Sequence, residues 1–317
     1  MARAALMPTA PRWRGAGGAA IVIAMLLAAL AATIAATLLW QQQRWINEHA
    51  HRRDQVQAQA LAMAGVQWAR QIVNDNAGGG IVHLGQPWAL KLPALPIENG
   101  SIAGYIVDAQ SRININNIAG VPAAPAPTRT ALQRLFAALA LPPSLLNAIG
   151  DWVDADDRVS EPGGAEDAWY LSQPRPGLAA NAPVRRASEL LAVRGVDPGS
   201  LARLLPLVGA LDAPTAVNVN TAPPEVLAAV VGGLDAAGAV ALVASRAQTP
   251  FVNIADFRAR LPRPNLVVDE TLIDVKSDWF EVSIEARQGD TVARARALLK
   301  RAAAANTWTL VVWEVVE

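Results

Sequence analysis

The chain has 317 residues, a formal net charge of zero at pH 7 and no cysteine. The lack of cysteine excludes a disulfide framework and a cysteine-ligated metal site. The balanced charge gives no indication of a polyanionic partner, because nucleic acids are bound mainly by clustered Lys and Arg. The length is enough for more than one hydrophobic core.

Residues 19–39 form an uninterrupted stretch without a charged side chain. An apolar helix of about 20 residues matches the hydrocarbon core of a bilayer, roughly 30 Å thick, and satisfies its own backbone hydrogen bonds there. A cleaved secretory signal has a shorter apolar region that ends at a small-residue cleavage site. We therefore predict a transmembrane helix that stays in the mature protein.

The predicted helix continues as an amphipathic segment over residues 40–76. No proline interrupts it, and Trp40 and Trp45 stand where interfacial aromatic anchors belong. A simple membrane anchor with a helical stalk fits these features as well. The face predicted to turn inward carries residues at spacings of three and four, namely Leu61, Ala64, Trp68 and Ile72.

A short leader, residues 1–18, precedes the apolar helix and ends in Gly18. It carries arginine but no acid, which favours an N-terminus on the cytoplasmic side. A basic leader ending in glycine before an uncut hydrophobic helix resembles the type IV pilin precursors. The resemblance implies that a prepilin peptidase cuts between Gly18 and Ala19, with Gly15 as the alternative position.

The fifth residue after that cut is Ile23. Pilin-like subunits usually carry a glutamate there, which in the family pairs with the terminal amine of a neighbouring subunit, because a buried charge in a membrane is costly unless paired. A subunit without this carboxylate has no charge to offer a predecessor. Ile23 therefore predicts a first or tip position in a fibre, and the alternative cut brings no acid to the fifth position either.

The remaining chain predicts an α+β fold. Residues 77–120 contain two expected strands, 101–108 and 111–118, joined by a turn. Residues 121–265 read mainly as helices separated by Pro and Gly. Strand patterns return in 266–317, where Phe280, Val282 and Ile284 alternate with polar residues. A helical domain inserted into an α+β domain explains this order.

Acidic side chains are concentrated between residues 151 and 167, beside the pair Gly163-Gly164. Such a density of carboxylates is repulsive without a cation, and oxygen ligands on a flexible loop suit calcium better than magnesium. The spacing is not that of an EF-hand, and a solvated acidic loop is the alternative. Tyr170, Asn181 and backbone carbonyls could complete a shell. The acids are Asp151, Asp154, Asp156, Asp157, Glu161, Glu166 and Asp167.

Residues 217–257 resemble a helix-hairpin-helix unit of the kind found in DNA-uptake receptors. In those units a glycine-rich hairpin presents backbone amides to phosphate. Here the hairpin, residues 232–238, contains Asp235 and no Lys or Arg. Because basic residues supply phosphate affinity, we predict a scaffold and expect no nucleic acid partner.

Nothing in the sequence indicates an enzyme. The histidines are His49, His51 and His83, and none has a spaced partner that suggests catalysis or metal binding. No nucleophile elbow, phosphate loop or zinc signature appears. We therefore predict a protein without catalytic activity.

Taken together, these features resemble the minor pseudopilin K family of type II secretion systems. The resemblance implies a type IV pilin-like fold, with a long N-terminal helix and an antiparallel sheet. A large α-helical domain interrupts it, built of two SAM-like or helix-hairpin-helix-like subdomains at about 121–210 and 211–265. The residues that carry the resemblance are Gly18, Ile23, 40–43, 108–117, 151–156, 164–167, Tyr170, 181–183, 189–190 and 217–222.

The resemblance also implies a function and a set of partners. It implies the tip of a periplasmic pseudopilus that initiates and caps assembly for export of folded proteins across the outer membrane. The partners implied are the I-type and J-type minor pseudopilins, extending to the H type and the major pseudopilin, together with the prepilin peptidase. The protein would cross the bacterial inner membrane once, with its C-terminal body in the periplasm.

The same resemblance implies a structural calcium ion in the acidic loop. The ligands implied are Asp154, Asp156, Asp157, Glu166 and Asp167. The rival interpretation of the whole chain is a membrane-anchored helix-hairpin-helix protein for DNA binding or uptake.

Overall fold

The computed structural model describes residues 17–75, 80–119, 127–301 and 308–317. The chain divides into two units, Met1–Gln57 and Ala58–Glu317. The described part of the first unit is the N-terminal portion of one long helix, α1 (Gly17–Asp75). Gly18 and Ala19 lie in the first turn of this helix, whereas residues 1–16 of the predicted leader, with Gly15, lie outside the described residues.

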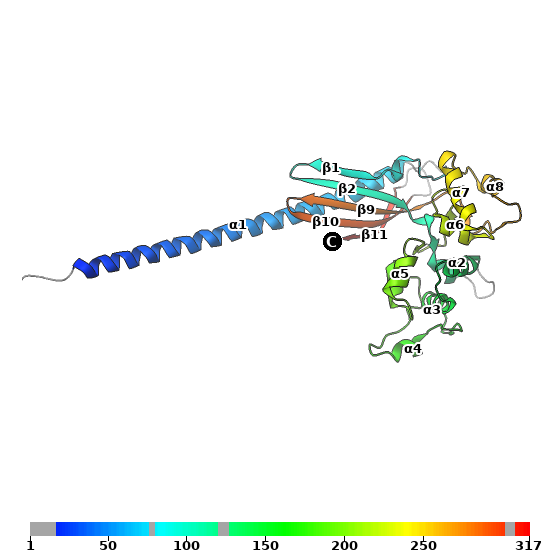
Figure 1. Cartoon of the computed structure of the whole chain (residues 1–317), viewed down its shortest axis with the longest axis horizontal. Coiled ribbons are helices and arrows are strands. Elements are labelled where there is room, and N and C mark those ends of the chain that lie inside the picture. Colours follow the sequence, from blue (N-terminus) through cyan, green and yellow to red (C-terminus); the bar gives the residue numbers. More distant parts are fainter. Residues whose placement is uncertain (1–16, 76–79, 120–126, 302–307) are drawn as a thin grey trace, which may run out of the picture. The chain divides into compact units, whose positions relative to one another are not determined.

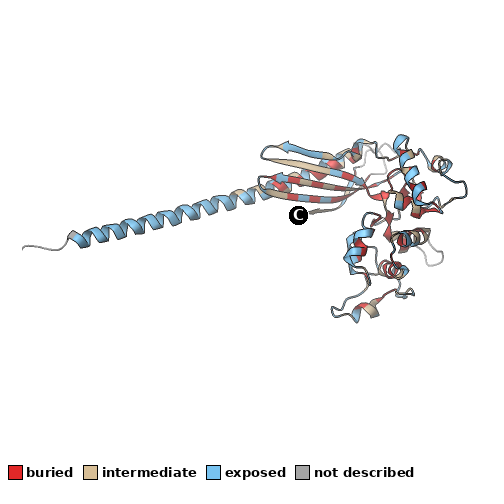
Figure 2. Ribbon diagram, in the orientation of Figure 1, coloured by how far each residue is buried: buried red, intermediate tan, exposed pale blue. Residues whose placement is uncertain are grey.

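Helix α1 is long and apolar enough to cross a membrane, with a mean hydropathy of 2.6 in its most apolar window. The described residues of this first unit are almost all exposed (Figure 2). In its described part, both threonine hydroxyls donate to the helix backbone, Thr33 Oγ1 to Ala29 O and Thr37 Oγ1 to Ile34 O, each at 2.8 Å. An exposed apolar surface with internally satisfied polar groups is what a single membrane span requires.

The second unit contains a five-stranded antiparallel sheet with the order β1-β2-β9-β10-β11 (Figure 1). Neighbouring β2 and β9 pair without a register shift from Gly100↔Gln288 to Asp108↔Phe280. This central pairing joins segments far apart in the sequence. The strands are β1 (Leu92–Ile97), β2 (Gly100–Asp108), β9 (Trp279–Gln288), β10 (Thr291–Lys300) and β11 (Leu310–Val316).

The C-terminal part of α1 packs on one face of this sheet through small side chains. Ala58, Ala62, Val66, Ala69 and Val73 are buried in a cluster with apolar residues of β2, β9 and β10. Their spacing of three and four places them on a single helix face.

The structure corrects the inward face predicted for this helix. Ala64 and Trp68 are exposed, and Leu61 and Ile72 are only partly buried at the margin of the core. The physical reason is close approach, because a Cβ added to Gly65 would lie 2.8 Å from Ile284 Cγ2. An interface this tight accepts Ala and Gly and leaves Trp outside.

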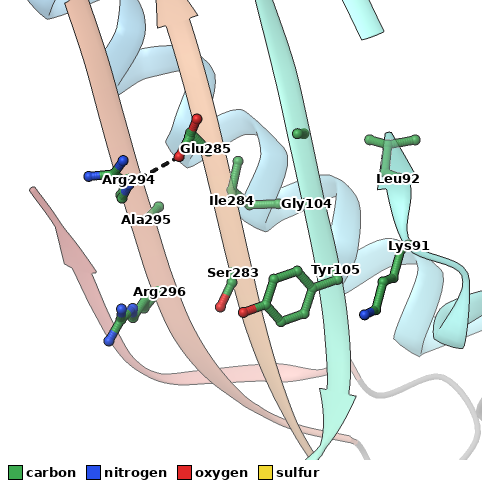
Figure 3. A pocket seen from close by; sticks show the side chains of 11 residues that line it. Lys91, Leu92, Gly104, Tyr105, Ser283, Ile284, Glu285, Arg294, Ala295 and Arg296 are labelled. Atoms are coloured by element: carbon green, nitrogen blue, oxygen red, sulfur yellow. Dashed lines mark hydrogen bonds and ion pairs between the residues drawn. The ribbon is translucent and has the colours of Figure 1, made fainter. Parts of the chain in front are cut away.

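The opposite face of the sheet is polar and carries a shallow groove of about 450 Å³ (Figure 3). Tyr105, Ser283 and Arg296 from three neighbouring strands line it, and Arg294 Nε donates to Glu285 Oε2 at 3.1 Å. One covered face and one polar face are typical of an antiparallel sheet.

The second predicted strand, residues 111–118, is wrong for most of its length. This segment contains the 3-10 turns η2 (Ala109–Ser111) and η3 (Ile115–Ala119), separated by the two-residue strand β3 (Ile113–Asn114). Strand β3 pairs in parallel with β4 (Val208–Gly209), outside the large sheet. Its asparagines explain the difference, because their side chains bond to the backbone of distant loops instead of facing solvent.

Strand β1 was not predicted, because Pro93 and Pro96 interrupt its pattern. Proline removes a donor from a ladder and is therefore tolerated only at sheet edges, which is the position that β1 occupies. A 3-10 turn, η1 (Pro87–Ala89), precedes it and buries Trp88 against the sheet core.

Most of the helical elements between β2 and β9 contribute to one hydrophobic cluster. Two-residue strands brace them, with β5 (Val217–Asn218) pairing β8 (Ile273–Asp274), and β6 (Val231–Gly232) pairing β7 (Val267–Val268). The helices are α2 (Pro127–Ala138), α3 (Pro143–Val153), α4 (Asp167–Leu171), α5 (Pro198–Leu204), α6 (Pro224–Val230), α7 (Ala236–Gln248) and α8 (Ile254–Ala259), with the 3-10 turn η4 (Ala187–Ala192). We refer to residues 109–278 as the insert.

The insert leaves the sheet and returns to it at one buried carboxylate. Asp108, the last residue of β2, accepts hydrogen bonds through Oδ2 from Thr221 and Ser277 hydroxyls at 2.6 Å and from Asn218 Nδ2 at 3.0 Å. Its Oδ1 accepts from Gln110 N at 2.8 Å. The side chain thus ties the sheet to both ends of the insert and to its second half.

Candidate metal centre

The acidic loop lies between α3 and α4. Asp151 is in the last turn of α3, Asp154 is its C-cap, and Glu166 and Asp167 stand at the start of α4. The loop is held to its surroundings by Arg194, whose Nη1 donates to Gly164 O at 2.9 Å. Short helices and this anchor therefore position the acidic side chains.

Asp151 is the most deeply buried acid of the loop, at 0 % exposure. Its two carboxylate oxygens accept from Ser160 N at 3.2 and 3.0 Å. A Cβ added to Gly164 would lie 2.1 Å from Asp151 Oδ2 and 2.4 Å from Ser160 O, so glycine is the residue that fits there. Asp151 therefore holds the loop in place by accepting a hydrogen bond from the loop backbone.

Four buried acceptor oxygens in the acidic loop and the segment after it have no hydrogen-bond partner among the described residues. They are Asp154 Oδ1, both carboxylate oxygens of Glu166, and Asn181 Oδ1. Glu166 as a whole is only 4 % exposed. Buried polar atoms are nearly always paired, and orphaned acceptors of this kind are groups that a bound cation would satisfy.

The electrostatics of Glu166 and Asp154 agree with this description. Burial, and then the charges of Asp151, Asp154, Asp156 and Asp167, raise the pKa of Glu166 to about 7. Burial, followed by the charges of Asp156 and Asp151, raises the pKa of Asp154 to about 6, with Arg129 opposing. The carboxylates therefore destabilise one another in their ionised forms.

The other ligands predicted from the sequence lie differently. Asp156 is exposed and its Oδ1 accepts from Arg158 N at 2.9 Å, while Asp157 is exposed. Asp167 Oδ1 accepts from Ala179 N at 2.9 Å. Among the five predicted ligands, the orphaned oxygens therefore come from Asp154 and Glu166, and the charges of Asp156 and Asp167 also act on Glu166.

The donor chemistry fits a hard cation, because carboxylate and amide oxygens are the ligands that calcium prefers. Within the described ranges, no three Asp, Glu or His side chains converge closely enough to hold a metal ion by themselves. Amide and backbone oxygens would therefore have to complete the shell. Asn181, which has a left-handed φ of 43° and an orphaned Oδ1, offers an amide oxygen of this kind.

Comparison with known proteins decides the family. Models described as type II secretion system (T2SS), protein K match residues 111–213 and 217–276. The type II secretion system protein K of Aeromonas hydrophila is 33 % identical over 243 residues, which cover 70 % of this chain and 73 % of the relative. The chain belongs to the type II secretion system protein K family.

Two further relatives extend the match over most of the chain. The protein K of Pseudomonas aeruginosa is 28 % identical over 289 residues, 87 % of this chain and 86 % of the relative. A chain in the crystal structure of the GspK-GspI-GspJ complex from enterotoxigenic Escherichia coli aligns with a TM-score of 0.67 and 26 % identity, covering 90 % of this chain and 99 % of that chain. The predicted family and the α+β fold with a helical insert are thereby confirmed.

Membership of the protein K family makes this chain a minor pseudopilin, a structural component and not a member of an enzyme family. Within the loop, sequence reasoning did not count Asp151 among the ligands and named Asn181 only as a contributor to the shell. The sequence carries a signal for the burial of Asp151, because it follows the apolar Ala148 by three positions and so lies on the same helix face. Nothing in the local sequence indicates that Asn181 Oδ1 would be orphaned.

Proposed function

We propose that this minor pseudopilin occupies the tip of the pseudopilus, where it initiates assembly and caps the fibre that exports folded proteins. The observation that carries the proposal is the place of the insert. The chain leaves the sheet after Asp108 and re-enters at Trp279, and these residues lie at one end of adjacent strands.

That end of the sheet is the one reached by the last turns of α1. Arg70 Nε donates to Thr309 O at 2.5 Å, and Thr309 N donates to Asn74 Oδ1 at 3.2 Å. Strand β11 begins directly after Thr309 and pairs Leu310 with Lys300, which in turn pairs with Trp279. The insert therefore emerges beside the C-terminal end of α1, whereas the apolar part of the helix is at its N-terminal end. A further subunit would have to stack where the insert lies.

Ile23 supports the same position. It lies in the apolar part of α1 with 57 % of its surface exposed and offers no carboxylate to a neighbour's terminal amine. The first subunit of a fibre has no predecessor, so it loses nothing by lacking the carboxylate. In any later position, the missing carboxylate would leave the terminal amine of the preceding subunit unpaired.

We further propose that the I-type and J-type minor pseudopilins are the direct partners, because the aligned structure is a complex of GspK with GspI and GspJ. The full chain, co-expressed with an I-type and a J-type subunit and extracted in detergent, should purify as a ternary complex. Failure of the three to associate in the presence of calcium would contradict the proposal.

The tip position has its own test. Ile23→Glu should let the subunit enter behind another one, so that site-specific cross-links to a preceding subunit appear that are absent in the wild type. Leu27→Glu places the same charge one turn later and serves as the control. Equal cross-linking of Ile23→Glu and the wild type would count against a tip function for residue 23.

Processing is proposed to occur between Gly18 and Ala19. Mass spectrometry of the protein recovered from cells with an active prepilin peptidase should give a mature N-terminus at Ala19. An N-terminus directly after Gly15 would move the fifth position to Ala20, and an unprocessed chain would contradict the pilin-type maturation.

A structural calcium ion in the acidic loop is proposed on the orphaned oxygens of Asp154, Glu166 and Asn181, with Asp156, Asp157 and Asp167 nearby in the sequence. The ion would neutralise the repelling carboxylates and fix the loop between α3 and α4. Chelation should lower the melting temperature of the full chain, and added calcium should restore it. A melting temperature that does not respond to either would overturn this site.

The rival function, DNA binding, meets an obstacle at the proposed hairpin. Asp235 caps α7 and accepts from Gly238 N at 2.7 Å, and Arg263 Nη2 lies 3.3 Å from Asp235 Oδ2. The chain's own carboxylate therefore takes an amide that a phosphate would need. Salt-dependent binding of duplex DNA at physiological ionic strength would nevertheless revive the rival.

A further inference from the structure

A second cluster of polar groups lies far from the acidic loop in the sequence, and its centre is Arg246 on α7. This residue is buried, at 7 % exposure, and its Nη1 donates to Val219 O at 2.6 Å. Among the described residues no carboxylate pairs with it. By contrast Arg301, which is 6 % exposed, lies 3.2 Å from a carboxylate oxygen of Asp278.

A buried guanidinium without a counter-charge is costly, because transfer of a charge out of water is repaid only by pairing. Burial lowers the pKa of Arg246 to about 10, which leaves the side chain charged at neutral pH. One carbonyl contact uses only one of the five N–H donors of arginine. The remaining donors are available to a ligand of opposite charge.

Arg246 lines a cavity of about 450 Å³. The walls come from the segment that follows α1, with His83, and from the insert, with Asn220, Arg246 and Gln248. No acidic side chain is among the described residues that line it. A volume of this size lies in the range of small-molecule sites, roughly 300 to 1,000 Å³.

The neighbouring polar groups present further donors. His83 Nδ1 accepts from Gly85 N at 3.2 Å, so the proton of the neutral ring is on Nε2, which then donates. Asn220 is already committed, since its amide exchanges hydrogen bonds of 2.8 and 2.9 Å with the backbone of Phe251. Gln248 is exposed at the edge of the cavity and has an amide that donates.

We propose that this cavity, lined by Arg246, His83 and Gln248, binds a small organic oxyanion through a carboxylate or phosphate group. The planar guanidinium fork matches either group. The ligand would touch both the segment after α1 and helix α7. It would therefore brace the insert against the pilin-like body, at the place where Val82 N already donates to Val275 O at 2.8 Å.

The test uses the full chain in detergent with citrate, glycerol 3-phosphate and inorganic phosphate as probes, each against sodium chloride of equal ionic strength. Thermal melting and calorimetric titration should show saturable binding of at least one probe. Binding of citrate alone identifies a carboxylate ligand, and binding of a phosphate probe alone identifies a phosphate ligand. No response beyond that to sodium chloride would overturn the proposal.

Variants locate the binding. His83→Ala should weaken the responding probe roughly tenfold, the effect of losing one hydrogen bond to a charged group. Arg246→Met should abolish binding, while Arg175→Gln, which changes an exposed arginine, should leave it unchanged. If Arg246→Met does not fold, the affinities of His83→Ala and Gln248→Ala for the responding probe test the site instead. Unchanged affinity in both of these variants would assign the binding to another site and overturn the proposal.

Discussion

At the scale of single residues, Glu166 has two buried carboxylate oxygens that find no partner within the described part of the chain. We expect Glu166→Gln to raise the melting temperature of the calcium-free protein, because the neutral amide removes repulsion from Asp151 and Asp154. The same change should abolish the rise that calcium produces. Scanning calorimetry with chelator and with calcium measures both effects.

Asp290→Asn is the charge-matched control for this experiment, since Asp290 is exposed in the turn between β9 and β10. It should keep the calcium response of the wild type. A Glu166→Gln protein that still responds fully to calcium would remove Glu166 from the ligand set.

Gly164 is a second residue with a sharp expectation. A methyl group there would lie 2.1 Å from a carboxylate oxygen of Asp151, so Gly164→Ala must displace the loop. The expected loss in free energy of unfolding is roughly 1–3 kcal/mol, as for other overpacked sites. Gly177→Ala is the matched control, because nothing lies within 4 Å of its added Cβ. Urea denaturation of both variants checks the difference, and equal stabilities would contradict the described loop.

At the scale of elements, α5 depends on its cap. Asp197 accepts from Gly199 N at 2.7 Å and Ser200 N at 3.0 Å, and Ser200 Oγ accepts from Asp197 N to complete a capping box. Asp197→Ala should destabilise the protein, whereas Asp197→Asn should keep most of the stability because asparagine also caps. Thermal melts at pH 7 compare the two, and similar losses in both would show that the cap is not the cause.

The same cap predicts a pH dependence. Hydrogen bonds from Ser200 and Gly199 lower the pKa of Asp197 below its ordinary value of 3.8. An acid with a lowered folded-state pKa adds stability above its unfolded pKa and loses it as the pH falls through the folded value. The difference between wild type and Asp197→Asn should therefore shrink below about pH 4. A difference that stays constant down to pH 2 would contradict this assignment.

Elements with a local signal were predictable, and elements that depend on distant partners were not. The membrane helix follows from the length and lack of charge of residues 19–39, and β9 from the alternation of Phe280, Val282 and Ile284. By contrast, Asn114 Nδ2 donates to Leu211 O, 97 residues away, so its segment could not be recognised as a loop from its neighbours. For the acidic loop, composition indicated a candidate site, but which acids face inward depends on how α3 and α4 are placed.

At the scale of the whole molecule, the sheet and the insert have separate large hydrophobic clusters. They are joined by the buried Asp108 and by a small third cluster, in which Ala109 and Leu211 of the insert pack with Trp279 and Leu298 of the sheet. Asp108→Ala would leave the Ser277 hydroxyl and the Gln110 amide without their acceptor, while Asn218 Nδ2 keeps Val82 O and Ser277 Oγ, and Thr221 Oγ1 keeps only Asn218 O at 3.3 Å. Each buried donor that is left without an acceptor costs about 1–3 kcal/mol. We expect a large loss in the free energy of unfolding and two denaturation transitions in place of one. Circular dichroism and tryptophan fluorescence during denaturation measure both effects. The control is Asp212→Ala, at an exposed position, which should keep the single transition of the wild type. A single transition in Asp108→Ala would contradict the prediction, because the two clusters would then unfold together without this link.

The direct pairing of β2 with β9 has a consequence for the order of folding. When β2 leaves the ribosome, its partner β1 is already present but its other partner β9 has not been made, and the whole insert must be synthesised before β9 arrives. Closing so long a loop is slow unless the intervening chain is already compact. A folded insert, with its two ends held by Asp108 at Gln110 and Ser277, brings the strands together as a short turn would. We therefore expect the insert to fold first; until it has done so, the unpaired backbone edge of β2 that receives β9 stays open to aggregation.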